Sequence, residues 1–174
     1  MLVDVNQDGK LDVAVSSFDS ADVRVLLNTT SATAALLHLR ACGRVRHRSR
    51  PSALAVGDFN GDGKKDLVTA NFSGSVTVLL NTTAIGAGTP SFTSSAPTAG
   101  ARPNGAFVAD FDRDGRDDIA IANYNNLQIG SASVFLNKTL TNAATPTFDA
   151  PLSLGGRSRP RRHLRRRLRR RRRP

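Results

Sequence analysis

Asp58-Phe-Asn-Gly-Asp-Gly-Lys-Lys-Asp66 is one of three copies of a nine-residue pattern in this 174-residue chain. The first copy is Asp4-Val-Asn-Gln-Asp-Gly-Lys-Leu-Asp12, and the third is Asp110-Phe-Asp-Arg-Asp-Gly-Arg-Asp-Asp118. Their starts lie 54 and 52 residues apart. A nearly fixed period of this size indicates an array of repeated units rather than a single irregular globule.

Short apolar runs surround each copy and are typical of β-strands. One set follows the loops directly: Val13–Val15, Leu67–Ala70 and Ile119–Ala122. A second set ends in Asn: Val23–Asn28, Val76–Asn81 and Val134–Asn137. Further candidates precede the second and third loops or contain a Phe in the spacer: Ala53–Val56, Ala106–Ala109, Pro90–Phe92 and Pro146–Phe148. Because the runs are apolar on both faces, we expect them to be sandwiched between neighbouring sheets.

Each position of the shared pattern Asp-x-[Asn/Asp]-x-Asp-Gly-x-x-Asp fits a loop around a hard cation. Side chains at positions 1, 3 and 5 of a tight loop converge on one point, as about six to eight oxygen ligands require. Gly at position 6 allows a sharp turn with positive φ. The remaining ligands are the backbone carbonyl of position 7 (Lys10, Lys64, Arg116) and the side chain of position 9 (Asp12, Asp66, Asp118). Calcium is expected rather than magnesium, which demands a stricter octahedron.

Two other interpretations of the loops are weaker. Asp/Asn/Gly clusters form ordinary turns, but three copies in register between apolar runs argue against that explanation. An EF-hand needs Glu at position 12 and flanking helices, whereas position 12 is Val15, Thr69 and Ile121.

About four strands for each repeat of fifty-odd residues is the size of one β-propeller blade. We therefore expect an all-β fold, a partial β-propeller of about three four-stranded blades with calcium loops. Successive loops should lie on the same edge of adjacent blades. The first loop departs from this scheme, because Met1 and Leu2 lead into it directly and no preceding strand is expected.

The run Ala55–Asp66 resembles the FG-GAP/VCBS repeats of integrin α-type propellers, and the resemblance covers roughly residues 2–30 and 51–151. It implies that the loop binds calcium between strands at the edge of a blade, and that the complete propeller commonly has seven blades. It also implies the side-chain ligands, position by position: Asp4, Asn6, Asp8 and Asp12; Asp58, Asn60, Asp62 and Asp66; Asp110, Asp112, Asp114 and Asp118.

The formal charge of +11 comes from two arginine-rich stretches. Residues 34–50 hold five arginines and residues 157–173 hold twelve, with no acidic residue in either stretch. The rest of the chain has 8 basic and 14 acidic residues, a net charge of −6. The single Cys and all three His lie in the same two stretches, so the remainder offers no zinc cluster, disulfide or Cys/His catalytic pair.

The tail has two interpretations, a basic arm that binds nucleic-acid phosphates or a frame-shifted fourth repeat. Arg159-Pro160 matches the Arg-Pro pairs that stand eight residues before the second and third loops, which places a fourth loop at Arg167. A one-nucleotide shift of GC-rich codons for Asp-Phe-Asp-Gly-Asp-Gly yields Arg-Leu-Arg-Arg-Arg-Arg, the sequence at 167–172. We favour a shifted frame for the tail and for Leu36–Arg48, where the displaced segment would have held one strand of the spacer. We expect no native fold in Ala34–Leu39 or in the tail, and regard nucleic acid as the weaker alternative partner.

These features predict five segments: a truncated first repeat at 1–33, an atypical basic stretch at 34–50, a second repeat at 51–100, a third repeat at 101–156 and the tail at 157–174. We expect a calcium-binding fragment of a secreted or cell-surface protein with a protein or glycan partner, acting in adhesion, in recognition or as a scaffold. It is not expected to be an enzyme, since no nucleophile–base pair exists outside the arginine-rich stretches. A non-catalytic module of a larger extracellular enzyme is the further alternative. No apolar run reaches the roughly 18 residues that span a membrane, and no export signal is recognised.

Overall fold

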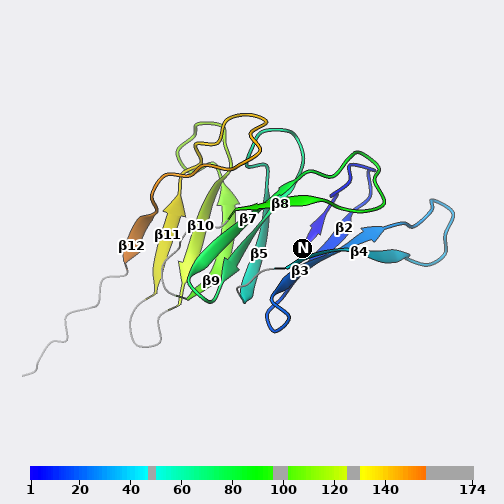
Figure 1. Ribbon diagram of the computed structural model, residues 1–174, viewed down its shortest axis with the longest axis horizontal. Coiled ribbons are helices and arrows are strands. Elements are labelled where there is room, and N and C mark those ends of the chain that lie inside the picture. Colours follow the sequence, from blue (N-terminus) through cyan, green and yellow to red (C-terminus); the bar gives the residue numbers. More distant parts are fainter. Residues whose placement is uncertain (47–49, 96–101, 125–129, 156–174) are drawn as a thin grey trace, which may run out of the picture.

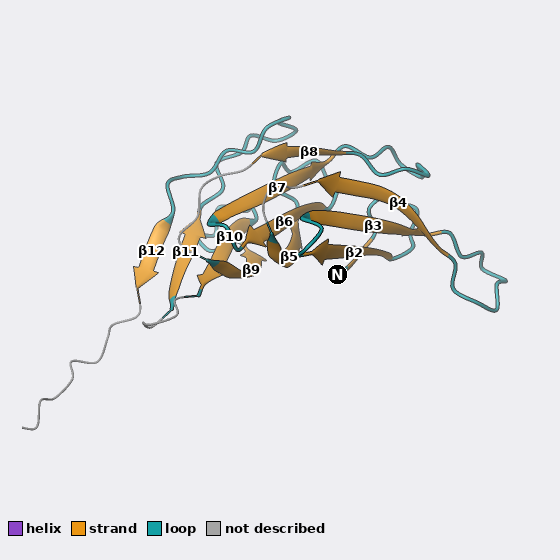
Figure 2. Ribbon diagram, turned by 60° about the horizontal axis from the view of Figure 1, so that its bottom comes forward, coloured by secondary structure: helices purple, strands orange, loops and turns teal. Residues whose placement is uncertain are grey.

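The computed structural model describes residues 1–46, 50–95, 102–124 and 130–155. Within these ranges the chain forms twelve strands and no helix, which confirms the all-β prediction (Figure 2). The strands make three four-stranded antiparallel sheets, and in each sheet the strands lie side by side in the order of the sequence. In the part of the chain that is described, no helix is long and apolar enough to cross a membrane.

Figure 1 shows the three sheets in succession, with the first at the right, the second in the middle and the third at the left. The first sheet contains β1 (Leu2–Val3), β2 (Asp12–Ser17), β3 (Asp22–Asn28) and β4 (Leu39–Arg46). The second contains β5 (Pro51–Gly57), β6 (Asp66–Asn71), β7 (Ser75–Asn81) and β8 (Phe92–Ser95). The third contains β9 (Pro103–Ala109), β10 (Asp118–Asn123), β11 (Ser131–Phe135) and β12 (Leu152–Gly155).

The hydrophobic core lies between successive sheets. One cluster joins the first and second sheets: Val3, Val5, Ala14, Val23, Val25, Leu27, Leu67 and Leu79. The other joins the second and third sheets: Ala55, Phe59, Val68, Ala70, Val76, Val78, Leu80, Ile119, Ile121 and Phe135. Leu67 and Val68 are neighbours in β6 but belong to different clusters, because side chains alternate between the faces of a strand. The second sheet is therefore buried on both faces, as its apolar runs predict.

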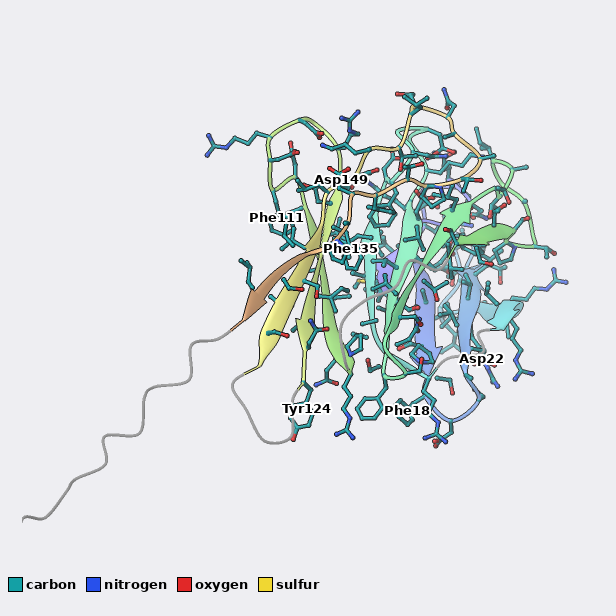
Figure 3. The ribbon with its side chains drawn as sticks, turned by 60° about the vertical axis from the view of Figure 1, so that its left-hand side comes forward. Phe18, Asp22, Phe111, Tyr124, Phe135 and Asp149 are labelled. Carbon is teal, nitrogen blue, oxygen red and sulfur yellow. The ribbon has the colours of Figure 1, made fainter. Side chains whose placement is uncertain are left out.

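A repeated arginine–aromatic contact links the sheets at the end opposite the loops. Phe18 and Phe72 follow β2 and β6, and their rings meet edge to face with centroids 5.8 Å apart. The guanidinium carbons of Arg50 and Arg102 lie 5.5 and 5.6 Å from the ring centroids of Phe18 and Phe72. Each Arg-Pro pair thus joins the start of one sheet to the preceding sheet through a cation–π interaction. Figure 3 shows Tyr124, which follows β10, at the same end as Phe18.

The first loop is preceded by a strand, so the prediction that none stands there is wrong. β1 pairs with β2 through Leu2 opposite Val13 and Val3 opposite Asp12. Val3 is 4% exposed and belongs to the core between the first two sheets. The two residues of β1 form a strand because the backbone edge of β2 needs hydrogen-bond partners wherever it is buried.

The basic middle stretch contains one strand, where the displaced segment Leu36–Arg48 was expected to have held one strand of the spacer. β4 pairs with β3 and begins at Leu39, the last residue of the segment Ala34–Leu39 to which the prediction assigned no native fold. The register matches that of the second sheet, since Leu39 lies opposite Asn28 as Phe92 lies opposite Asn81. The edge of β3 presents backbone donors and acceptors that pairing satisfies whatever side chains the partner carries.

Three predictions about the arginine-rich stretches stay predictions: the frame disruption, the fourth repeat and the binding of nucleic acid. A frame disruption is a property of the gene, and the position of β4 does not test it. The tail at 157–174 lies outside the described residues, and with it the fourth repeat and any binding of nucleic acid at that place.

The fourth strand of the third sheet lies further along the chain than predicted. Phe148 makes only an isolated bridge with Asn137. β12 begins at Leu152, which lies opposite Val134 in β11. Pro151 has no backbone N–H to donate, and it separates the bridge from the strand.

Candidate metal-binding loops

Each nine-residue loop joins the first and second strands of its sheet. Neighbouring loops touch, because Gln7 Nε2 in the first loop donates to the Gly63 carbonyl in the second at 3.1 Å. Asp58 N in the second loop donates to Asp117 Oδ2 in the third at 2.8 Å. The predicted placement of successive loops on one edge of adjacent sheets is therefore confirmed.

The first Asp of each loop shapes the turn. In the second loop, Asp58 Oδ1 accepts a hydrogen bond from Asp62 N at 3.2 Å, and Oδ2 accepts one from Gly63 N at 2.9 Å. Asp4 and Asp110 make the same pair of bonds in their loops. The position-6 residues have the positive φ that the pattern predicts: 83° at Gly9, 81° at Gly63 and 85° at Gly115. A side chain would strain this turn.

The position-5 carboxylates hold the peptide of position 7. Oδ1 accepts a hydrogen bond from the position-7 N–H in every loop: Lys10 to Asp8 at 2.9 Å, Lys64 to Asp62 at 2.9 Å and Arg116 to Asp114 at 3.1 Å. These bonds fix the orientation of the peptide that follows the glycine. The carbonyls of Lys10, Lys64 and Arg116 stay predicted ligands.

The position-9 aspartates are buried and bind the backbone through both oxygens. Asp66 Oδ2 accepts a hydrogen bond from Phe59 N at 2.8 Å, and Oδ1 accepts one from Asn81 N at 2.7 Å. Asp12 and Asp118 make the equivalent pairs of bonds. All three are fully buried. Each therefore ties the start of its loop to the third strand of its sheet or to the residues just after it, a role that the sequence did not indicate.

Burial raises the pKa of Asp66 to about 7. The hydrogen bonds from Asn81 N and Phe59 N favour the charged form without cancelling the effect of burial, and the Asp62 and Asp58 carboxylates raise the pKa further. A divalent cation among these three carboxylates would oppose their mutual repulsion.

Position 3 presents a buried amide in the first two loops. Asn6 and Asn60 are 5% and 7% exposed. Their Nδ2 groups donate to the carbonyls of Ala87 and Ala143 in the following sheet, at 3.1 and 3.2 Å. Asn6 Oδ1 is buried and has no hydrogen-bond partner among the described residues. Because an unpaired buried oxygen destabilises the fold, Asn6 fits the predicted role of a metal ligand.

The third loop brings three carboxylates together. One oxygen from each of Asp110, Asp112 and Asp118 lies within 4.8 Å of the other two. This spacing suits one cation bound by side chains, and the hard oxygen donors suit calcium. In the first two loops an amide oxygen stands where Asp112 places its carboxylate, so the donor set fits the same ion there.

Lys138 distinguishes the third loop from the other two. Its Nζ lies 3.2 Å from Asp112 Oδ2 and 3.3 Å from Asp114 Oδ2, and these contacts raise the pKa of Lys138. A hydrogen bond from Arg116, supported by the one from Lys138, holds the pKa of Asp114 below its usual range. In the first two sheets the equivalent position carries threonine: Thr29 and Thr82. In the third loop, Lys138 thus adds a cation beside two predicted ligands, Asp112 and Asp114.

The asparagines at the end of the third strands, or just after it, hold the loops against the next sheet, and the sequence did not reveal this role. Asn81 Nδ2 donates to the Val5 carbonyl in the loop of the first sheet at 2.8 Å. Asn137 Nδ2 donates to the Phe59 carbonyl in the loop of the second sheet at 2.9 Å. The available signal was the Asn at the end of each second apolar run, whose partner lies more than seventy residues away.

The family model of the FG-GAP-like repeat matches the chain at residues 4–69 and at residues 58–121. Each match begins at the first Asp of one loop and ends in the strand that follows the next loop. None of the curated proteins matches the chain. The two family matches together span more than half of the sequence, and they follow the repeat that the structure displays as three equivalent sheets. The chain therefore belongs to the family of FG-GAP-like repeat proteins.

Proposed function

We propose that this chain is a calcium-binding repeat module of a secreted or cell-surface protein, and that its three sheets are consecutive blades of a β-propeller. The observation that carries the proposal is the cluster of Asp110, Asp112 and Asp118, which lies in a loop that the chain repeats three times. The unpaired Asn6 Oδ1 supports the same chemistry in the first loop. FG-GAP-like repeats are typical of extracellular proteins.

The loop residues would both bind the ion and stabilise the shape of the loop. In the second loop, Asp58, Asn60, Asp62 and Asp66 would bind calcium through side chains and Lys64 through its carbonyl. Bound calcium would supply the positive charge that offsets the repulsion among the carboxylates. An ion that binds only the folded chain adds about 4 kcal/mol of stability at a thousandfold excess over Kd.

The role of the module would be non-catalytic. Its recurrent polar side chains are used for structure, since Asp66 closes its loop and Asn81 joins two sheets. The module would therefore serve adhesion, recognition or scaffolding by presenting a rigid surface to a protein or glycan partner.

Calcium titration of the full chain tests the proposal by calorimetry and by thermal unfolding. We expect saturable heat and a Tm that rises with calcium up to about 1 mM, the range of extracellular sites. The double variant Asp110→Asn with Asp112→Ala removes one carboxylate charge and one oxygen ligand, and should lose the part of the heat due to the third loop. Asp149→Asn removes an exposed carboxylate outside the loops and should bind like the unmodified chain. An absence of calcium-dependent heat and of any change in Tm would overturn the proposal.

A further inference from the structure

The two contacts between neighbouring sheets follow one pattern. The Asn at the end of a third strand, or just after it, donates to the position-2 carbonyl in the loop of the preceding sheet, as Asn81 does to Val5 and Asn137 to Phe59. A spacer N–H donates to the position-3 carbonyl at 2.7 Å in both contacts: Gly86 to Asn6 and Asn142 to Asn60. The side chain at position 2 is then covered, with Val5 at 0% and Phe59 at 1% exposed. Each sheet thus has an acceptor face toward the following sheet and a donor face toward the preceding one.

The acceptor face of the third sheet has no neighbour in the described part of the chain. Phe111, at position 2 of its loop, is 48% exposed, and no described N–H donates to its carbonyl. Figure 3 shows Phe111 on the outer side of this sheet, whereas Phe135 packs toward the second sheet. Other apolar side chains are exposed on the strands of the third sheet: Phe107 at 62%, Leu152 at 57% and Leu154 at 62%. Exposed apolar side chains gathered on one sheet in this way mark an interaction site.

The donor face of the first sheet is open in the same way. Asn28 ends β3 as Asn81 ends β7, but its Nδ2 donates to Leu11 O alone, at 3.2 Å, among the described residues. Val15 is 46% exposed, whereas the equivalent residues of β6 and β10 are fully buried: Thr69 and Ile121. Beside Val15 lies a hollow of about 510 Å³, which is lined by Val15, Arg24, Leu26, Ala41, Gly43 and Arg44.

We propose that the acceptor face of the third sheet binds the donor face of the first sheet of a second copy of this chain. The contact reuses the pattern of the internal ones. Asn28 Nδ2 donates to the Phe111 carbonyl, and the spacer N–H of Thr33 donates to the Asp112 carbonyl. One internal bond is missing, because Asp112 lacks the amide donor that Asn6 and Asn60 use.

The apolar parts of the two faces are also complementary. Phe107 stands three residues before its loop, where the second sheet has the small Ala55. A larger side chain at this place needs room on the opposing face, and the hollow beside Val15 provides it. Close packing of a protruding ring into a hollow resembles the packing of a protein interior.

A second copy suits these faces because each of them lacks the group that the other supplies. The two faces differ, so the contact is heterologous and joins copies head to tail. Such contacts close into a ring or continue as a chain, and every copy uses both faces except at an open end.

Sedimentation velocity on the full chain tests this contact at about 100 μM protein, where even a micromolar Kd gives association. Salt at about 0.5 M screens the arginine-rich stretches. We expect oligomers for the unmodified chain, and monomers for Phe107→Asp and for Val15→Asp. An equimolar mixture of these two variants should form a dimer of one copy of each, since each variant keeps one intact face. Ile85→Asp, at a 76% exposed position in the loop between β7 and β8, is the matched control and should associate like the unmodified chain.

Circular dichroism and thermal unfolding show whether each variant keeps the fold. If Phe107→Asp or Val15→Asp does not fold, the uncharged single variant Phe107→Ser or Val15→Ser replaces it. A monomeric unmodified chain would overturn the proposal and would favour a further repeat or a different protein on these faces. Folded variants that do not combine in the mixture would also overturn it, because the contact would not then be head to tail.

Discussion

The second and third loops share five of their nine residues, yet they differ in how they are covered. Phe59 and Asn60 of the second loop are 1% and 7% exposed, because the third sheet packs over them. Phe111 of the third loop is 48% exposed, and Asp112 is exposed and pairs with Lys138. The nine-residue pattern therefore shapes a loop locally, whereas its burial comes from the following sheet.

The largest difference in unfolding free energy between equivalent variants of the two loops should come from the Phe ring at position 2. Phe59 is buried and meets the Phe148 ring edge to face, with centroids 6.0 Å apart. Phe59→Ala should cost about 3–5 kcal/mol of the free energy of unfolding, while Phe111→Ala should cost less than about 1 kcal/mol. Urea unfolding at protein concentrations too low for association measures both. Equal losses would show that the following sheet does not provide the burial.

A second difference should follow from the asparagine that covers the loop. Asn137 Nδ2 donates to the buried Phe59 carbonyl and to the Asp117 carbonyl, both at 2.9 Å. Asn137→Ala leaves these acceptors unpaired and should cost about 2–3 kcal/mol. Asn28→Ala removes the equivalent side chain of the first sheet, which covers no loop of another sheet among the described residues, and should cost about 1 kcal/mol or less.

Scanning calorimetry of the two asparagine variants gives the comparison directly. We expect Asn137→Ala to lower Tm by several times as much as Asn28→Ala. Asn81→Ala, which uncovers the first loop, should behave like Asn137→Ala because Asn81 donates to the Val5 carbonyl at 2.8 Å. Similar shifts for all three variants would mean that the bonds within each sheet, rather than the cover over the loop, determine the effect.

Local patterns account for what the sequence predicted correctly. The turn at Gly63 and the strands on both sides of it depend on residues close together in the chain, and the structure places them where the pattern indicates. The role of Asp66 was missed, because one of its oxygens binds Asn81 N, 15 residues away. β1 was missed for a similar reason, since strand pairing satisfies backbone groups and needs no apolar signature.

The smallest expected effect concerns the ion rather than the fold. Lys138 Nζ lies 3.2 Å from Asp112 Oδ2 and 3.3 Å from Asp114 Oδ2, so its charge would repel calcium in the third loop. Near the surface, a unit charge about 5 Å from a divalent ion costs about 1–2 kcal/mol in a water-like medium. Lys138→Thr should therefore strengthen calcium binding by the third loop about tenfold, with little change in the stability of the calcium-free chain.

The second loop provides the reciprocal experiment, because Thr82 stands where the third sheet has Lys138 and its side chain is exposed. Thr82→Lys should weaken calcium binding by the second loop about as much as Lys138→Thr strengthens it in the third. Calorimetric titration resolves the two effects if each variant is made in a chain whose other two loops carry Asp→Asn at position 1, which removes the charge of one predicted ligand in each. A charge effect also diminishes as salt is raised from about 0.05 to 0.5 M, whereas a change in loop shape does not. Salt-independent shifts in Kd would mean that Lys138 acts on the geometry of the loop, and the difference between the two loops would then not be electrostatic.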